Sequence, residues 1–192
     1  MIASIRPRLA GISRTGKIVM AVAAVAAVGA CCAVIVASGP GTPVPDRATP
    51  LARGFSLPEL GQPGHTISLA AYPGDPVIVN FFASWCSPCQ RETPMLARFY
   101  ESQRGKVLIL GIDSNDEAAA ALSFVHRTGV GYPVGFDAFP ATVTTSYGVF
   151  ALPQTFFLNA RHRIVSHVLG PVTMTDLTRG VAAMDGSHQE RS

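Results

Sequence analysis

The pattern with the most evident chemistry in this sequence is a pair of cysteines two residues apart, in Trp85-Cys86-Ser87-Pro88-Cys89. This spacing suits either a redox-active disulfide or one half of a zinc site. A zinc site needs four ligands, and the chain has neither a second CxxC nor an HxxxH pattern. The sequence places no partner for its histidines, which are His65, His126, His162, His167 and His188. We therefore expect thiol–disulfide chemistry and no bound metal.

The elements around the pair place it at the start of a helix. Residues 76–82 are apolar with β-branched and aromatic side chains, which is typical of a buried strand, and a helical pattern follows from Ser87. A helix N-terminus lowers the pKa of a nearby thiol, because unpaired N–H groups and the helix dipole favour negative charge. Pro88 suits the first turn, since it lacks an N–H that would have no partner there. We expect Cys86 to be the attacking nucleophile and Cys89, one turn inside the helix, to be the resolving thiol.

A static disulfide is the structural alternative for the same pair. A structural bridge gains most stability by closing a long loop, and a bridge between Cys86 and Cys89 closes almost none. Exchange through a mixed disulfide is the chemistry that the spacing favours.

Strand and helix patterns alternate along the rest of the chain. Strands are expected at 55–60, 66–69, 107–112, 132–136, 155–158 and 164–169, and helices at 116–128, 141–148 and 172–184. The polar run Asp113 to Asp116 lacks the spacing of a calcium loop. We interpret it as a strand end and a helix start, with Ser114 or Asn115 as the N-cap and acidic residues in the first turn. The order of elements predicts an α/β fold with a mixed sheet and helices on both faces.

Charge divides the 192-residue chain into a basic, apolar leader and a near-neutral domain. The net charge is +3, but residues 1–38 hold four basic side chains and no acid. Residues 18–37 are uncharged and as a helix would span about 30 Å, the thickness of a bilayer core. The positive-inside rule then makes 1–17 cytoplasmic and 18–38 a transmembrane signal anchor. A Pro/Gly-rich tether (39–54), a domain (55–184) and a disordered tail (185–192) follow. Because the excess of basic residues is confined to the leader, the charge pattern excludes a typical nucleic-acid binder.

Two other fates of the leader stay open. Residues 36–38 resemble a loose signal-peptidase site, and Val28-Gly29-Ala30-Cys31 resembles the lipobox of a lipoprotein. Cys31 and Cys32 lie inside the apolar stretch, where a free cysteine behaves as a small hydrophobic residue; lipidation or pairing between chains are the alternatives. Each of these readings places the domain outside the cytoplasm.

The segment VIVNFFASWCSPCQRETP resembles the active-site strand and helix of thioredoxin-fold proteins. More narrowly, the chain resembles the membrane-anchored TlpA/ResA/CcmG group of thiol–disulfide oxidoreductases over residues 55–184. The motifs that carry this resemblance are FSLPEL, WCSPC, GIDSNDE and YGVFALPQTFFLN. The resemblance implies a thioredoxin-like fold with an N-terminal strand extension and an inserted helix and strand, preceded by one transmembrane helix.

The resemblance also assigns roles outside the cysteine pair. Pro153 corresponds to the cis-proline that faces the disulfide, and its neighbourhood with Leu152 is expected to pair with an extended substrate. Glu92 shares a helix face with Cys89 and would exchange protons with it; a solvated Glu92 is the alternative. Asn80 stands where thioredoxin has an acid. The expected substrate-binding residues are Trp85, Ser87, Pro88, Leu152 and Pro153; Pro94 is expected to kink the helix.

The function implied by this resemblance is an extracytoplasmic disulfide reductase. It would receive electrons from a transmembrane donor of the CcdA or DsbD type and reduce exported proteins, with apocytochrome c as one candidate. The alternative is a thiol oxidase that forms disulfides, because the same residues run in either direction. A peroxidase needs Thr or Ser where Ala83 stands, copper chaperones of this fold use CxxxC, and Gln90 breaks the CxxCH haem motif. No cofactor is expected.

Overall fold

The structure is a computed structural model that describes residues 49–103 and 105–186. The predicted segments 1–17 and 18–38, with Cys31 and Cys32, lie outside these residues, as do 39–48 of the tether and 187–192 of the tail. Within the two described ranges, no helix has the length and apolar character needed to cross a bilayer. The predicted anchor therefore stays a prediction.

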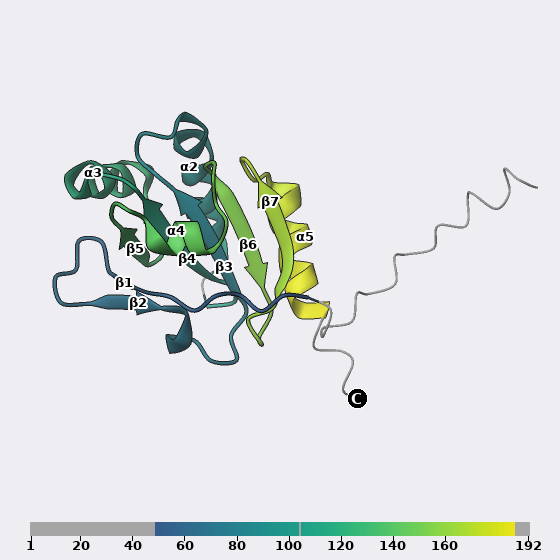
Figure 1. The fold of residues 1–192 in the computed structure, drawn as a ribbon. Helices are drawn as coiled ribbons and strands as arrows, with labels where there is room; N and C mark the ends of the chain where they lie inside the picture. The colour runs from purple at the N-terminus through teal and green to yellow at the C-terminus, as the bar shows by residue number, and fades with distance from the viewer. Residues whose placement is uncertain (1–48, 104, 187–192) are drawn as a thin grey trace, which may run out of the picture. The chain divides into compact units, whose positions relative to one another are not determined.

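A five-stranded mixed sheet forms the centre of the fold (Figure 1). Its strands, in the order in which they lie side by side, are β5 (Val134–Asp137), β4 (Leu108–Ser114), β3 (Val77–Phe82), β6 (Gln154–Leu158) and β7 (Ile164–Leu169). β3, β4 and β5 run parallel to one another, and β6 runs antiparallel to both β3 and β7. The mixed sheet predicted from the sequence is confirmed.

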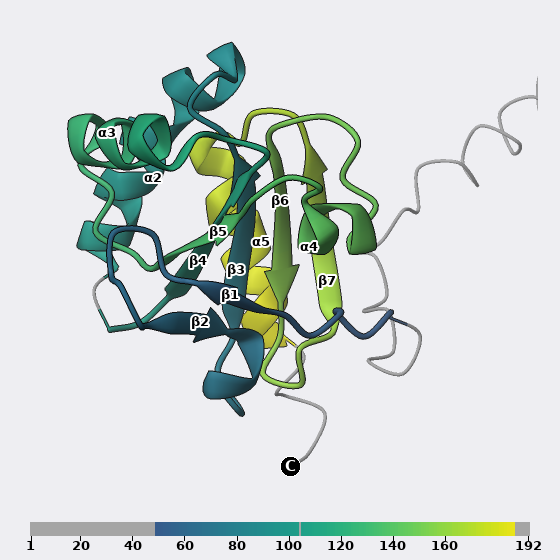
Figure 2. The ribbon, with the colours of Figure 1, turned by 60° about the vertical axis from the view of Figure 1, so that its left-hand side comes forward.

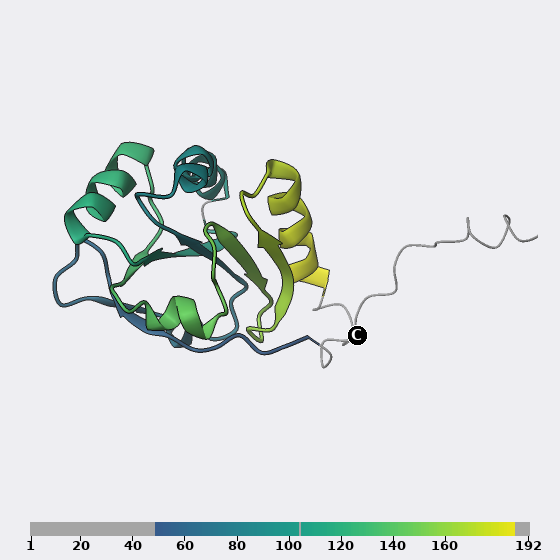
Figure 3. The ribbon, with the colours of Figure 1, turned by 45° about the horizontal axis from the view of Figure 1, so that its top comes forward.

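Helices cover both faces of this sheet. On one face lie α2 (Ser87–Ser102), α3 (Ala118–Thr128) and α5 (Met174–Gly186) (Figure 3). The other face is covered by α4 (Thr142–Ser146) and the antiparallel hairpin of β1 (Ser56–Pro58) and β2 (Thr66–Ser68), which ends in the 3₁₀ turn η2 (Leu69–Ala71) (Figure 2). The α3–β5 unit and the hairpin are the insertion and the strand extension that the family resemblance implies.

Side-chain alternation along β3 divides the core into two layers. Val77, Val79 and Phe81 belong to the layer beneath the hairpin and α4, whereas Ile78 and Phe82 belong to the layer beneath α2. Asn80 lies on the α2 side of the same strand and is fully buried. A polar residue at the centre of a buried strand needs hydrogen-bond partners, and α2 supplies one of them.

Two predicted boundaries of the domain need correction. The tether was expected to extend to residue 54, but the backbone of Ala52 donates to His162 O at 2.8 Å and Ile164 N donates to Pro50 O at 2.9 Å. Residues 50–52 are therefore bound to the turn before β7, because these backbone groups satisfy that edge of the domain. At the other end, α5 continues to Gly186, past the predicted limit at residue 184.

The start of α3 also differs from the prediction. Its N-cap is Glu117, which makes no side-chain cap bond, and its first turn contains no acidic residue. Ser114 and Asn115 are therefore not the cap: β4 extends through Ser114, whose hydroxyl pairs with the Thr144 hydroxyl at 2.6 Å. Asp116 precedes the helix and binds elsewhere, as described below.

Candidate active site

Cys86 and Cys89 form a disulfide at the N-terminus of α2. Cys86 is the N-cap, and its Sγ accepts a hydrogen bond from the backbone N–H of Cys89 at 3.2 Å. Cys86 is 5% exposed and Cys89 is fully buried. A sulfur that accepts from a helix N-terminal N–H is in an environment that favours a thiolate. Of the pair, Cys86 is the sulfur that a partner molecule reaches first.

The turn that carries Cys86 is tied to the loop between β4 and α3. The Asp116 carboxylate accepts from Ser84 N at 2.5 Å and from Ser84 Oγ at 3.0 Å. Trp85 Nε1 donates to Asn115 O at 3.1 Å, and Gln90 Nε2 donates to Ser84 O at 2.6 Å. The Trp85 ring itself is 59% exposed. These hydrogen bonds fix the turn against the β4–α3 loop, and the exposed ring of Trp85 lies next to the disulfide in the chain.

Glu92 is buried and hydrogen-bonded on both carboxylate oxygens. Its Oε1 accepts from Asn80 Nδ2 at 3.1 Å and its Oε2 accepts from Val172 N at 2.8 Å. Burial raises the pKa of Glu92 to about 7, and the two hydrogen bonds, with the Asn80 amide oriented as in this structure, act in the opposite direction. The alternative of a solvated Glu92 is wrong, because the side chain points inward at 4% exposure. A carboxyl group with a pKa near neutrality can both take up and release a proton at physiological pH.

Pro153 follows a cis peptide bond after Leu152, as the resemblance implied. The antiparallel register pairs Phe81 of β3 with Gln154 of β6, so Pro153 lies beside the end of β3 from which the cysteine turn departs. The carbonyl of Pro153 accepts from Gly170 N at 3.0 Å. The half-buried Leu152 packs against the core cluster that contains both cysteines.

The remaining predicted substrate-binding residues occupy the first turn of α2. Ser87 is exposed and Pro88 is half-buried. Trp85 directly precedes Cys86 in the chain, and the Leu152–Pro153 pair lies beside the end of β3 that leads to the disulfide. Pro94 lies inside α2, which continues past it to Ser102; the kink expected there stays a prediction.

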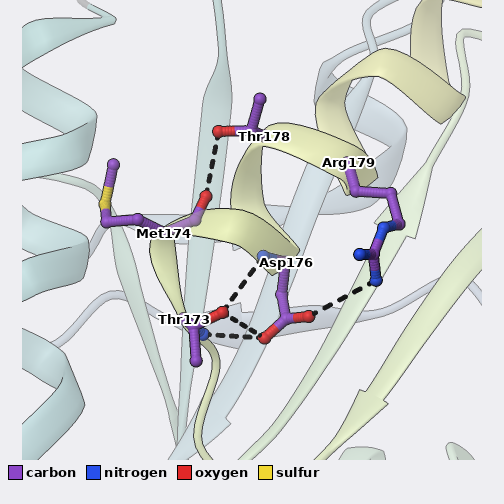
Figure 4. A network of polar contacts seen from close by, with 5 residues as sticks. All are labelled: Thr173, Met174, Asp176, Thr178 and Arg179. Carbon is purple, nitrogen blue, oxygen red and sulfur yellow. Dashed lines mark hydrogen bonds and ion pairs between the residues drawn. The ribbon is translucent and has the colours of Figure 1, made fainter.

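The segment that binds Glu92 also begins α5. One residue after Val172, Thr173 and Asp176 form a reciprocal cap: Asp176 N donates to Thr173 Oγ1 at 3.2 Å, and Thr173 N donates to Asp176 Oδ2 at 2.9 Å (Figure 4). This is the capping-box arrangement, which satisfies two helix N-terminal N–H groups at once. Arg179 lies 3.9 Å from Asp176 (Figure 4), an exposed pair that contributes little. The cap begins α5 directly after Val172, the residue whose N–H donates to Glu92.

A second buried carboxyl group lies behind the cysteine turn and was not singled out as functional from the sequence. Asp113, at the end of β4, is fully buried, and neither of its oxygens accepts a hydrogen bond from the described residues. Burial, followed by the charge and the hydrogen bonding of the neighbouring Asp116 carboxylate and then by the charge of Asp137, raises its pKa to about 8. Its position at a strand end, directly after the apolar run 107–112, was the only signal in the sequence.

These features define a class of protein: a thioredoxin-like fold with a CxxC disulfide at the start of α2, a cis-proline beside it and a buried carboxyl group behind it. A family model described as the AhpC/TSA family matches residues 41–167. The chain belongs to this family. Ala83, which is buried and has no hydroxyl, stands where the peroxidase motif needs Thr or Ser.

The relatives found by sequence are named thiol–disulfide oxidoreductase ResA. The protein from Bacillus thuringiensis (strain Al Hakam) is 31% identical over 115 residues, which is 59% of this chain and 66% of the relative, slightly under two thirds of its length. The protein from Halalkalibacterium halodurans is 32% identical over 128 residues, covering 66% of this chain and 71% of the relative.

A solved structure extends the likeness to three dimensions. A DsbF homologue from Corynebacterium diphtheriae superposes with a TM-score of 0.64 at 25% identity, covering 76% of this chain and 96% of that one. The chain is therefore a thioredoxin-superfamily relative of the ResA proteins, and the resemblance noted in its sequence is confirmed.

Proposed function

We propose that this chain catalyses thiol–disulfide exchange with protein substrates, with Cys86 as the nucleophile and Cys89 as the resolving thiol. The observation that carries the proposal is the disulfide at the N-terminus of α2, in which Cys86 accepts a backbone hydrogen bond at 3.2 Å and Cys89 is fully buried. A bridge that spans three positions in the sequence adds little by closing a loop. Reversible chemistry accounts for it better than a structural role.

The reaction runs in two displacement steps from the reduced form. The Cys86 thiolate attacks one sulfur of a substrate disulfide, so that a mixed disulfide forms and the first substrate thiolate leaves. Cys89 gives its proton to the Glu92 carboxylate, and the resulting thiolate attacks the Cys86 sulfur. The Cys86–Cys89 disulfide forms and the second substrate thiolate leaves. Two electrons pass from the cysteine pair to the substrate.

The substrate contacts proposed here surround the disulfide. Trp85 offers an exposed ring, Ser87 and Pro88 form the first turn, and the Leu152–Pro153 segment lies across from the turn. An extended substrate strand beside Pro153 would bring its own disulfide to Cys86, as in strand-addition binding.

We place the reaction outside the cytoplasmic membrane and in the reducing direction. The apolar residues 18–38 with basic residues only before them support a signal anchor whose domain is exported. The ResA relationship supports reduction of exported proteins, with apocytochrome c as a candidate substrate and a CcdA- or DsbD-type membrane protein as the electron donor. Cleavage of the leader and lipidation at Cys31 remain alternatives that leave the compartment unchanged.

Trapping tests the exchange mechanism. The Cys89→Ala variant cannot resolve its mixed disulfide, so we expect it to hold a substrate protein covalently on Cys86. The Cys86→Ala variant is the matched control and should hold none. Adducts are identified on non-reducing gels and by mass spectrometry before and after reduction. Equal recovery of adducts from both variants, or from neither, contradicts the assignment of Cys86 and Cys89.

The reduction potential decides the direction. A value well above about −180 mV lies toward strong oxidants. That result would replace the reductase with the second candidate, a thiol oxidase that forms disulfides in exported proteins. Equilibration of the Cys86–Cys89 pair with glutathione buffers measures the potential, and the Cys86→Ala variant corrects for background.

A further inference from the structure

The side-chain amide of Asn80 has hydrogen-bond partners at its nitrogen and, among the described residues, none at its oxygen. It is fully buried at the centre of β3. Its Nδ2 donates to Glu92 Oε1 at 3.1 Å and to Thr155 Oγ1 at 3.0 Å, whereas its Oδ1 accepts from none of the described residues. The amide orientation is assigned from these contacts, because an oxygen in the place of Nδ2 would face an ionised carboxylate. A buried acceptor without a donor is unfavourable, and a position that keeps one calls for a reason.

The hydrogen bonds of Glu92 suit only its ionised form. Both oxygens accept, from Asn80 Nδ2 and from Val172 N. When Glu92 is protonated, one oxygen becomes a donor and needs an acceptor. The backbone N–H of Val172 can only donate, so this partner cannot serve. The unpaired Oδ1 of Asn80 is an acceptor attached to the side chain that already touches Glu92.

The other groups that face Glu92 do not replace this acceptor. Cys89, one turn earlier on α2, is the proton donor in the proposed exchange. Tyr132 is buried, and burial together with the charge of Glu92 raises the pKa of its phenol, so Tyr132 stays neutral. Its hydroxyl makes no hydrogen bond to the described residues, Glu92 included, so it does not reach the carboxyl group in this arrangement. Thr155 on β6 is held by Asn80 itself.

We propose that Asn80 is a positioning residue that serves both protonation states of Glu92 by turning its amide. At a pH above the titration of Glu92, Nδ2 of Asn80 donates to the carboxylate. At a lower pH, a half turn about χ2 of Asn80 brings Oδ1 to the same place, where it accepts from the carboxylic acid. The Thr155 hydroxyl follows, because a hydroxyl can accept from Nδ2 or donate to Oδ1. One end of the amide lacks a partner in either orientation, so the two orientations differ mainly in what they offer Glu92.

This inference rests on the proposed exchange, in which Glu92 alternates between carboxylate and acid once per turnover. A fixed donor would favour the carboxylate alone and would make the acid an unsatisfied group. A turning amide keeps the carboxyl group in place in both states. Asn80 has no proton to exchange, unlike the acid that thioredoxin has at this position, so its contribution is restricted to orientation.

Nuclear magnetic resonance of the full-length oxidised protein tests the turn directly. We expect the nuclear Overhauser effect between the Asn80 Nδ2 protons and the Thr155 methyl group to be strong at pH 9 and to weaken through the Glu92 transition. The Glu92→Gln variant, which has no such transition, should show no pH dependence of this effect. An unchanged effect across the transition, or no transition of Glu92 between pH 5 and 9, overturns the proposal.

Single-turnover kinetics with 5,5′-dithiobis(2-nitrobenzoate) distinguish a turning Asn80 amide from a fixed donor. The readout is the pH at which the rate of the second release shows its inflection. The first thionitrobenzoate release reports attack by Cys86, and the second reports resolution by Cys89. In Asn80→Leu both forms of Glu92 lose a partner, so we expect the inflection of the second release to stay near its wild-type pH. A fixed donor predicts a rise of about one pH unit, as for loss of a hydrogen bond to a charged group.

The two measurements separate this inference from the function on which it rests. If neither thionitrobenzoate release occurs in the wild-type protein, the exchange mechanism fails. If both releases occur and the Asn80→Leu inflection rises by about one unit, the exchange stands and the turning amide is wrong. If Asn80→Leu does not fold, the Overhauser measurement on the wild-type protein still decides.

Discussion

The carboxylate of Asp116 accepts hydrogen bonds from both the backbone N–H and the hydroxyl of Ser84, at 2.5 and 3.0 Å. Ser84 lies two residues before Cys86, so this contact fixes where the turn that carries Cys86 leaves β3. The contact joins residues 32 positions apart in the sequence. It makes the β4–α3 loop a support for the active site.

Replacing Asp116 with Ala should therefore destabilise the cysteine turn. We expect the free energy of unfolding to fall by about 1–3 kcal/mol, because the buried side of the turn loses its acceptor. Ser84→Ala removes only the hydroxyl contact and should lose less. Urea unfolding of the oxidised proteins measures both. If Ser84→Ala lowers the free energy of unfolding as much as Asp116→Ala does, the hydrogen bond from Ser84 N to Asp116 contributes nothing to stability.

Because the pKa of Asp113 is raised in the folded protein, we expect the free energy of unfolding to fall as the pH rises. Its pKa is about 8 in the folded protein and about 3.9 in an unfolded chain. Between these values the folded state binds the proton and the unfolded state does not, so stability is greatest below the lower pKa and is lost through the higher one. The raised pKa of Glu92, about 7, acts in the same direction.

Asp113→Asn should remove the titration of this residue while keeping an uncharged side chain of nearly the same shape. The variant should match the wild type near pH 4 and become relatively more stable up to pH 8, with a slope of at most about 1.4 kcal/mol per pH unit. Glu117→Gln, at an exposed carboxyl group that makes no side-chain cap bond, is the control and should follow the wild type. Parallel curves for Asp113→Asn and the wild type would contradict the raised pKa.

The sequence predicted those parts of the molecule that depend on local pattern. Every strand and helix expected between residues 55 and 184 is present, and the longer ones combine an apolar period with Gly or Pro near an end. Cys86 at a helix start followed from the strand before it and from Pro88 in the first turn. Glu92 and Pro153 required the family resemblance, since neither spacing nor composition distinguishes them.

The contacts that the sequence did not predict all join distant segments. Asn115 was expected to cap α3, yet its carbonyl holds Trp85, and Asp116 holds Ser84. The Val172 backbone binds Glu92 across 80 positions. The apolar periodicity of a helix or strand shows which of its faces packs against the core. It carries no information on which loops contact one another. Asp113 belongs to the same group, because its unpaired state depends on what surrounds the end of β4.

Trp85 should affect protein substrates more than small disulfides. Its ring is 59% exposed and its indole N–H is bound to Asn115 O, so the ring is oriented and little buried. We expect Trp85→Ala to slow reduction of a protein disulfide by about tenfold, as for loss of an aromatic contact at an interface, while its reaction with glutathione disulfide changes little. Insulin turbidity and glutathione assays compare the two. An equal loss with both substrates would assign Trp85 to the cysteine environment instead.

The capping box of α5 should influence Glu92 as well as stability. Thr173→Ala removes the hydroxyl that accepts from Asp176 N, and loss of an N-cap lowers the free energy of unfolding by about 1 kcal/mol. Thr178→Ala is the matched control on the exposed side of the same helix, where the hydroxyl bonds only to Met174 O, and should lose little. Thermal unfolding ranks the two variants.

A second effect separates a helix cap from a support for the active site. Val172 immediately precedes the cap and donates to Glu92 Oε2 at 2.8 Å, a contact that holds the pKa of Glu92 below what burial alone would produce. If Thr173→Ala loosens this segment, the donor weakens and the pH inflection of Cys89 resolution rises. Thr178→Ala should keep the wild-type inflection. A loss of stability in Thr173→Ala with an unchanged inflection would show that the cap stabilises α5 without positioning the donor to Glu92.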